Sequence, residues 1–318
     1  MAPDLAIIIV SWNTRDLTLD ALRTLYADLD ANGPDAAVWV VDNASTDGTP
    51  ESIREQCPRA TLIASDANLG FAGANNHALR LLGFGESAAP PGGPNAVYLL
   101  NPDTRTQPGA TRALYDALFS LPRAGVVGAQ LSYADGSFQH SAFGFPGLRQ
   151  LIVELFPLPG RFYESRFNGR YPRELVQAGA PFPVDHTLGA TMMLRAEVIA
   201  QSGLFDEQFV MYCEEIDWSI RIRRAGWAIY CVPKAHVIHL AGQSTGQVRP
   251  QSVVNLWRSR LLLFDKHDPP LKRAVARQII RLGMRRKITE TRRAFAAGQL
   301  SAAERDALID AYRTVQTL

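Results

Sequence analysis

Cysteine is scarce in this sequence of 318 residues. The three cysteines, Cys57, Cys213 and Cys231, lie far apart and are odd in number. Zinc sites need cysteines or histidines at short spacings, and small disulfide-bonded domains need an even set of cysteines. The composition therefore argues against both kinds of protein, and it fits the reducing cytoplasm.

Long apolar segments are also lacking. No stretch approaches the roughly 18 consecutive apolar residues of a membrane-spanning helix. The apolar run Leu5–Val10 is short and has neither a basic start nor a cleavage-like site, so we predict no signal peptide. We expect a cytoplasmic protein. Hydrophobic residues still make up 47% of the chain, which is enough to build one large domain or two smaller ones.

Charge is unevenly distributed along the chain, although the net charge is only +2. Residues 246–318 hold 15 lysines and arginines against 6 acids, a net charge of +9, and the remainder carries −7. This contrast predicts two parts, an acidic domain over residues 1–245 and a basic helical extension over residues 246–318.

Strand-like and helix-like segments alternate in the first half of the chain. Short β-rich runs predict strands at Leu5–Val10, Val38–Val41, Thr61–Ala64, Val97–Leu100 and Val126–Leu131. Helical spacing predicts helices at Asp16–Leu29, from an N-cap at Thr49, at Ala72–Leu82 and at Gly109–Ser120. This order predicts an α/β fold with a doubly wound, mostly parallel sheet.

The pattern changes after this half of the chain. Tyr133–Ser137 predicts a hairpin turn. Residues 141–183 are aromatic, Pro-rich and irregular, and they form either a long loop or a small subdomain. The elements expected after them are an ordered segment at Thr187–Leu194, helices at Ala196–Ser202 and Glu214–Ala225, a strand at Ala228–Val232, and helices over residues 253–318.

Four successive strands are followed by small polar residues, glycines or acids. Ligands bind at the carboxyl ends of the strands in a doubly wound sheet, so the four ends together predict one pocket. Taken alone, residues 42–48 could be a turn with side-chain hydrogen bonds, and residues 68–76 the capped start of a helix. No GxGxxG motif follows the first strand, which disfavours a dinucleotide-binding dehydrogenase.

Six segments can be recognised, in this order along the chain: IIIVSWN, VVDNASTDGT, NLGFAGANN, YLLNPDT, GLFDEQFVMYCEEIDWSIR and HVIHLAG. With them the chain resembles family-two glycosyltransferases of the GT-A fold, in particular their bacterial rhamnosyltransferase-like branch, over about Leu5 to Gly242. The resemblance implies a GT-A-type fold and an inverting glycosyltransferase. It also implies a nucleotide-diphospho-sugar donor, first dTDP-rhamnose and then UDP-sugars, and a glycan or lipid-linked glycan acceptor.

The resemblance further implies that the first three strand ends bind the donor. Asp42 should accept the imide N–H of a uracil or thymine ring, because a carboxylate is a strong acceptor for that donor. Further contacts are expected to the nucleotide from Ser11, Asn13, Asn43 and Ser45, and to the diphosphate or sugar from Asn68, Gly70 and Asn75.

A divalent cation is also implied by the resemblance. Asp103 matches the last acid of the family's Asp-x-Asp motif, and Asn101 replaces the first acid. One carboxylate with an amide oxygen suits Mg²⁺, which keeps waters and takes phosphate oxygens, and Mn²⁺ fits as well. His239 matches a histidine that completes the metal site in relatives, although an isolated histidine is more often structural. The ion would neutralise the leaving diphosphate.

Glu214 and Glu215 stand where relatives usually have Glu-Asp, whose second acid is the base. Glu215 is therefore the expected base, with Glu214 beside the substrate, and clustered carboxylates should raise the pKa of the base. Acids at a helix start also favour the helix dipole, and Asp217 should only pair with Arg221. The departures at Asn101 and Glu215 leave open a catalytically inactive nucleotide-sugar-binding or scaffolding protein.

A segment of small residues resembles the part of the relatives that lies under the acceptor. Residues 187–191, which include Gly189 and Ala190, match the floor under the acceptor in relatives, and the aromatic residues between 143 and 182 would shape its pocket. Both segments could equally serve packing alone.

The basic extension has a helical pattern. Between Lys272 and Arg293 nine bases face one acid, Glu290, and aliphatic residues lie among them. This pattern favours a basic amphipathic helix at an anionic membrane surface, so the enzyme would be peripheral on the inner face of the membrane. The alternative is a solvated helix that packs on the acidic body. Nucleic acid binding is disfavoured, because aromatics interleaved with the bases are lacking.

Overall fold

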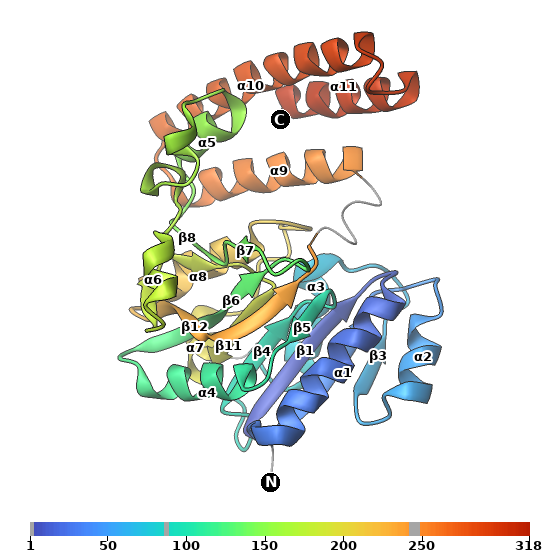
Figure 1. Ribbon diagram of the computed structural model, residues 1–318, viewed down its shortest axis with the longest axis vertical. Helices are drawn as coiled ribbons and strands as arrows, with labels where there is room; N and C mark the ends of the chain where they lie inside the picture. The colour runs from blue at the N-terminus through green and yellow to red at the C-terminus, as the bar shows by residue number, and fades with distance from the viewer. Residues whose placement is uncertain (1–2, 86–88, 242–248) are drawn as a thin grey trace. The chain divides into compact units, whose positions relative to one another are not determined.

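The computed structural model describes residues 3–85, 89–241 and 249–318. The chain forms two compact units, which are coloured along the sequence in Figure 1. The first unit combines residues 1–143, 171–208 and 214–244, and the second combines residues 144–170, 209–213 and 245–318. The predicted boundary between residues 245 and 246 lies outside the described residues and stays a prediction. The second unit takes two segments, residues 144–170 and 209–213, from within the predicted domain of residues 1–245.

The first unit is built on a mixed sheet with the strand order β3-β2-β1-β4-β11-β6-β12-β5. In addition, β7 pairs with β6 and β9 pairs with β12. Strands β3, β2, β1, β4, β6 and β12 run in one direction, and β11 and β5 oppose them. The predicted α/β fold with a mostly parallel sheet is confirmed. The strand bounds are β1 Leu5–Ser11, β2 Ala36–Asp42, β3 Thr61–Ala64, β4 Ala96–Leu100, β5 Thr104–Thr106, β6 Ala124–Ser132, β7 Phe138–Gln139, β9 Phe182–Val184, β11 Thr191–Arg195 and β12 Ala228–His239.

The central strands are apolar at nearly every position because both faces of the sheet are covered. In β1, Ile7 and Ile9 contribute to a core with Leu22 and Leu114, while Ile8 contributes to a separate core on the other face. Helices α1 (Arg15–Asn32) and α4 (Ala110–Ser120) therefore cover one face of the sheet (Figure 1). Helices α3 (Gly70–Leu81), α7 (Ala196–Ser202) and α8 (Glu214–Arg224) cover the other face.

Several local predictions are confirmed and others are wrong. The hairpin turn is present, with Tyr133 N donating to Ser137 O at 2.9 Å. Helix α2 (Thr49–Gln56) has Gly48 at its N-cap rather than Thr49, because Gly48 adopts the left-handed φ of 81° that glycine tolerates best. Strand β5 was not predicted, and β12 extends to His239 rather than ending at Val232.

The segment predicted as irregular contains regular elements in both units. Helix α6 (Arg173–Gln177) and strand β9 belong to the first unit, and so does the small sheet of β8 (Ala142–Phe143) with β10 (His186–Thr187). Helix α5 (Leu148–Leu155) and two short 3-10 helices, Gly160–Phe162 and Arg166–Asn168, belong to the second.

The second unit is helical, as the periodicity of the extension predicts. Helices α9 (Arg249–His267), α10 (Pro270–Ala296) and α11 (Ala302–Thr317) pack with α5 around a core that includes Leu155, Trp257 and Ile280. A Cβ atom at Gly283 would lie 2.6 Å from Leu155 Cδ1, so glycine permits the close contact between α10 and α5. In the part of the chain that the structure describes, no helix is both long and apolar enough to cross a bilayer.

Candidate active site

The ends of β1 and β2 are joined by a hydrogen-bond network around Asp42. The Asp42 carboxylate is buried, and its Oδ2 accepts from Ser45 N at 2.9 Å. Ser45 Oγ in turn accepts from Asn13 N at 2.9 Å. Asp42 Oδ1 has no hydrogen-bond partner among the described residues. A buried carboxylate oxygen without a partner is costly, which makes Asp42 Oδ1 a candidate acceptor for a ligand donor.

The loop before α3 is held against the end of β2. Asn43 Nδ2 donates to Asn68 Oδ1 at 2.9 Å, and Asn43 Oδ1 accepts from Leu69 N at 2.7 Å. Asn68 Oδ1 also accepts from Gly70 N at 2.9 Å. The structure therefore brings Asn43, Asn68 and Gly70 together, as the strand-end pattern predicts.

Ser11 and Asn75, which were predicted to contact the nucleotide-sugar, use their polar side-chain atoms in hydrogen bonds within the protein. Ser11 is fully buried, and its hydroxyl lies 2.8 Å from the Thr18 hydroxyl. Asn75 is buried, and its amide donates to Phe71 O within α3 at 2.9 Å. These contacts stabilise the starts of α1 and α3, and the roles of Ser11 and Asn75 toward a nucleotide-sugar stay predictions.

A short antiparallel pairing places His239 beside Asp103. Thr104, the first residue of β5, pairs with His239 at the end of β12. Leu240 N donates to Asp103 O at 2.9 Å, which fixes the backbone there. His239 Nε2 consequently lies 3.3 Å from Asp103 Oδ1, with the side chains 8% and 10% exposed.

The Asp103–His239 pair is suited to a divalent cation. Neither Asp103 Oδ1 nor His239 Nδ1 has a hydrogen-bond partner in the described ranges. Two ligand atoms bound at about 2.1 Å to an octahedral cation lie about 3 Å apart, which is close to the observed 3.3 Å. No group of three histidines, cysteines or acids that could hold a metal occurs among the described residues.

Gly189 and Ala190 link the end of β4 to the start of α8. Asn101 N donates to Ala190 O at 3.0 Å. A Cβ atom at Gly189 would lie 3.6 Å from both Cβ and Cγ of Glu215, and 4.0 Å from the ring of Phe71. The segment with Gly189 and Ala190 thus lies next to Asn101, Glu215 and Phe71.

The two glutamates at the start of α8 have perturbed acidities. Burial raises the pKa of Glu215 to about 7. Burial, and then the charge of Glu215, raise the pKa of Glu214 well above its ordinary value. Oε2 of each side chain has no partner among the described residues. Glu215 is half-buried, and a carboxyl group with a pKa near neutrality can exchange a proton with a substrate.

Asp217 on the same helix has the structural role expected for it. It is completely buried, and its Oδ2 accepts from Arg221 Nε at 2.9 Å. Arg221 Nη2 also donates to Leu204 O at 2.7 Å, so the pair ties α8 to the residues after α7.

Replacing Asp217 with alanine should destabilise the fold, because it leaves the largely buried Arg221 without its counter-charge. Breaking such a pair costs about 3–5 kcal/mol of the free energy of unfolding, measurable by urea denaturation. Asp306, in an exposed pair with Arg305, provides the control, since Asp306→Asn should leave stability nearly unchanged. Equal stabilities of the two variants would contradict the role of Asp217.

Some residues near the candidate site were not predicted. Arg15 and Asp47 line a hollow of about 420 Å³ together with Asn13, and Asp47 Oδ2 accepts from Arg15 N at 2.9 Å. Asn76 ties α3 to the chain after α7, since its Nδ2 donates to Phe205 O at 2.9 Å. Asp47 lies within residues 42–48, a strand-end segment that the sequence had singled out, whereas Arg15 lies outside these segments and nothing in the sequence points from Asn76 to Phe205.

A family model for glycosyl transferase family 2 matches residues 6–198. The match covers more than half of the chain, so the chain belongs to glycosyl transferase family 2. The protein is accordingly a glycosyltransferase, as its resemblance to the family implied.

Curated relatives and a solved structure agree with this assignment. The chain is 34% identical, over 73% of its length and 76% of the relative, to the N-acetylglucosaminyl-diphospho-decaprenol L-rhamnosyltransferase of Mycobacterium tuberculosis. It is 26% identical, over 82% of its length and 76% of the relative, to the low-salt glycan biosynthesis hexosyltransferase Agl10 of Haloferax volcanii. A mannosyltransferase of Pyrobaculum calidifontis, solved with GDP-Man and Mn²⁺, aligns with a TM-score of 0.53 and 20% identity over 100% of this chain and 84% of that chain, which supports the fold.

Proposed function

We propose that the enzyme transfers L-rhamnose from dTDP-rhamnose to a lipid-linked glycan, with inversion at the anomeric carbon. The observation that carries this proposal is the 34% identity to the mycobacterial L-rhamnosyltransferase, whose name gives both the sugar and a lipid-diphosphate acceptor. UDP-hexoses are the second donor class, because another relative is named a hexosyltransferase. Such an enzyme would work in the cytoplasm, at the membrane surface that holds its acceptor.

Asp42 is proposed to recognise the pyrimidine base. Its buried Oδ1 has no partner among the described residues, and it can accept the imide N–H of thymine or uracil. Asn13 and Ser45 hold this loop through the hydrogen bonds around Asp42. Asn43, Asn68 and Gly70 would border the diphosphate or sugar.

Replacing Asp42 with asparagine should weaken dTDP binding by about 10–100-fold, because hydrogen bonds to a charged group contribute about 1.5–3 kcal/mol. A thermal-shift titration with dTDP measures this change, since a ligand that binds the folded state raises its melting temperature. Asp116→Asn, which changes an exposed acid on α4 away from the strand ends, is the matched control. An unchanged affinity of Asp42→Asn would contradict the proposed role.

Asp103 and His239 are proposed to hold Mg²⁺ or Mn²⁺, with Asn101 beside them. Asp103 Oδ1 has no hydrogen-bond partner among the described residues and lies 3.3 Å from His239 Nε2, and both observations support this proposal. A bound cation would supply positive charge to the leaving diphosphate.

Glu215 is proposed to be the general base. Its carboxylate would take the proton of an acceptor hydroxyl that lies over Gly189 and Ala190, with Glu214 next to it. The acceptor oxygen would form its bond to the anomeric carbon as the bond from that carbon to the diphosphate oxygen breaks, which releases dTDP and inverts the configuration. A pKa of about 7 for Glu215 supports a proton transfer near neutral pH.

The test combines dTDP-rhamnose with a synthetic polyprenyl-diphospho-N-acetylglucosamine acceptor and Mn²⁺. The proposal expects dTDP release together with a rhamnosylated lipid of inverted anomeric configuration, identified by NMR. Turnover of UDP-glucose in preference to dTDP-rhamnose would contradict the donor. A protein that binds dTDP-rhamnose without any turnover would favour the inactive nucleotide-sugar-binding alternative, which none of the comparisons supports.

A further inference from the structure

Helix α10 carries aliphatic side chains on two opposite faces. Ile280 and Met284 are buried in the core of the second unit. On the other side, Leu271 and Leu282 are 78% and 52% exposed, and Val275 is exposed as well. Positions 271, 275, 278, 282, 285, 289 and 293 follow one another at steps of three or four residues, so they form one stripe along the helix. The stripe does not serve the packing of the second unit.

The bases of α10 fall into two groups. Several form ion pairs within the second unit: Lys272 with Asp268, Arg277 with Asp265, and Arg286 and Lys287 with Glu290. Four exposed arginines on or beside the stripe have no ion-pair partner among the described residues: Arg281, Arg285, Arg292 and Arg293. We call these four arginines with Leu271, Val275 and Leu282 the outer face of α10.

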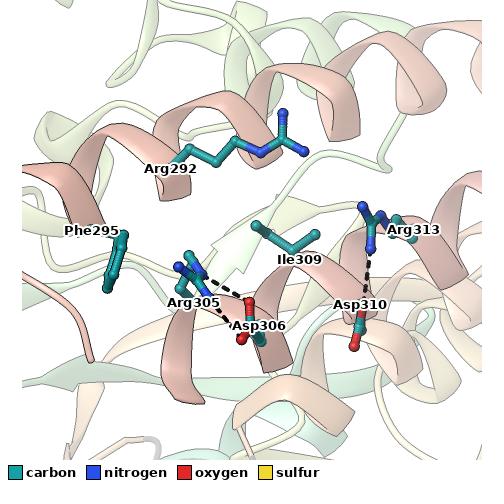
Figure 2. A pocket seen from close by; sticks show the side chains of 7 residues that line it. All are labelled: Arg292, Phe295, Arg305, Asp306, Ile309, Asp310 and Arg313. Carbon is teal, nitrogen blue, oxygen red and sulfur yellow. Dashed lines mark hydrogen bonds and ion pairs between the residues drawn. The ribbon is translucent and has the colours of Figure 1, made fainter. Parts of the chain in front are cut away.

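Arg292 lines a groove between α10 and α11, where arginines with and without an ion-pair partner among the described residues lie close together. Figure 2 shows the side chains that line this groove of about 580 Å³. Arg305 pairs with Asp306 at 2.8 Å and Arg313 with Asp310 at 3.3 Å, whereas no bond is drawn to Arg292. The two acids in the groove, Asp306 and Asp310, are therefore engaged by arginines of α11, and the charge of Arg292 is left for another partner.

We propose that the outer face of α10 docks on an anionic lipid bilayer. Exposed aliphatic residues beside arginines without ion-pair partners suit the boundary between acyl chains and phosphate groups. A nucleic acid would engage the arginines but leave Leu271 and Leu282 in water, since its affinity comes from phosphate contacts. The inference rests on the proposed function only in that a lipid-linked acceptor also lies at a bilayer.

Vesicle sedimentation of the full chain tests this inference. We expect binding to vesicles of equimolar phosphatidylcholine and phosphatidylglycerol, weak binding to pure phosphatidylcholine, and weaker binding at high salt. Replacing Arg281, Arg285, Arg292 and Arg293 together with glutamine should lower the partition coefficient by more than about 100-fold, at about fivefold per arginine. Leu271→Ser with Leu282→Ser should lower it as well.

The matched control removes the same charge from the first unit, at the exposed arginines Arg23, Arg54, Arg59 and Arg80. This variant should bind mixed vesicles nearly as the wild type does. Equal losses in the two quadruple variants, full binding by the α10 variant, or binding of the wild type to duplex DNA but not to vesicles would each overturn the proposal. An unchanged melting temperature and unchanged donor hydrolysis in solution distinguish lost docking from misfolding and from failure of the proposed reaction.

Discussion

Replacing Glu215 with glutamine is expected to lower kcat by about 10²–10⁴-fold, the usual contribution of a general base. Glutamine keeps the size of the side chain and its contact with Gly189, but it cannot take a proton from the acceptor. The affinity for dTDP-rhamnose should change little, because the pyrimidine end of the donor is assigned to Asp42. Steady-state kinetics with the lipid acceptor measures both effects.

The pH profile gives an independent readout of the same group. The carboxylate is the active form, so kcat/KM should fall about tenfold per pH unit below the pKa of about 7 and level off above it. Glu215→Gln should remove this limb, and Glu197→Gln, an exposed acid on α7, should retain it. Wild-type kcat and an unchanged profile in Glu215→Gln would rule out the assigned base.

Stability should change with pH in the opposite direction to activity. Burial raises the pKa of Glu215 from 4.5 to about 7 and so favours its neutral form in the folded protein. The unfolded chain loses this proton first, so the folded state loses stability as the pH rises through this interval. Glu215→Gln should reduce the loss without abolishing it, because Glu214 has a raised pKa too.

Replacing Asp103 with alanine is expected to lower cation-dependent turnover strongly. Loss of a stabilising electrostatic contact in an active site typically costs about 10²–10³ in kcat. Mn²⁺ affinity should fall by more than the roughly 10–100-fold that loss of an outer-shell partner costs. Calorimetric Mn²⁺ titration in the presence of dTDP measures the affinity, and kinetics measures the turnover.

The matched control for Asp103 is Asp116→Ala, which removes an exposed acid on α4. It should bind Mn²⁺ and turn over as the wild type does. His239→Ala should weaken Mn²⁺ binding as well, since its ring nitrogen lies beside Asp103 Oδ1. Wild-type Mn²⁺ affinity in both Asp103→Ala and His239→Ala would place the cation elsewhere.

The fold could be predicted largely from hydrophobic runs, because the central strands are buried on both faces. β1 and β4 are continuous apolar segments, and the polar residues that follow them come to one edge of the sheet. Asp42 and Asn43 at the end of β2 and Asn68 after β3 were identified from the same strand-end pattern, and each has hydrogen bonds there. The turn at Tyr133–Ser137 followed from its residue types alone.

Contacts between segments far apart in the sequence could not be predicted from hydrophobic runs and turn residues. Strand β5 has three residues, Thr104–Thr106, and no apolar alternation to mark it, yet its pairing with β12 sets the position of His239. The contact of Gly189 with Glu215 likewise depends on how α8 packs on the sheet. His239, Gly189 and Glu215 were identified from the resemblance to relatives, because local sequence propensity does not show which distant segments come together.

The most direct test of the account is a crystal structure of the enzyme with Mn²⁺ and dTDP-rhamnose, with the metal located by its anomalous scattering. We expect one metal peak at Asp103 Oδ1 and His239 Nε2, in contact with the diphosphate, and the Glu215 carboxylate on the face of the anomeric carbon opposite the leaving oxygen. A metal peak away from Asp103, or Glu215 on the same side as the diphosphate, would contradict it.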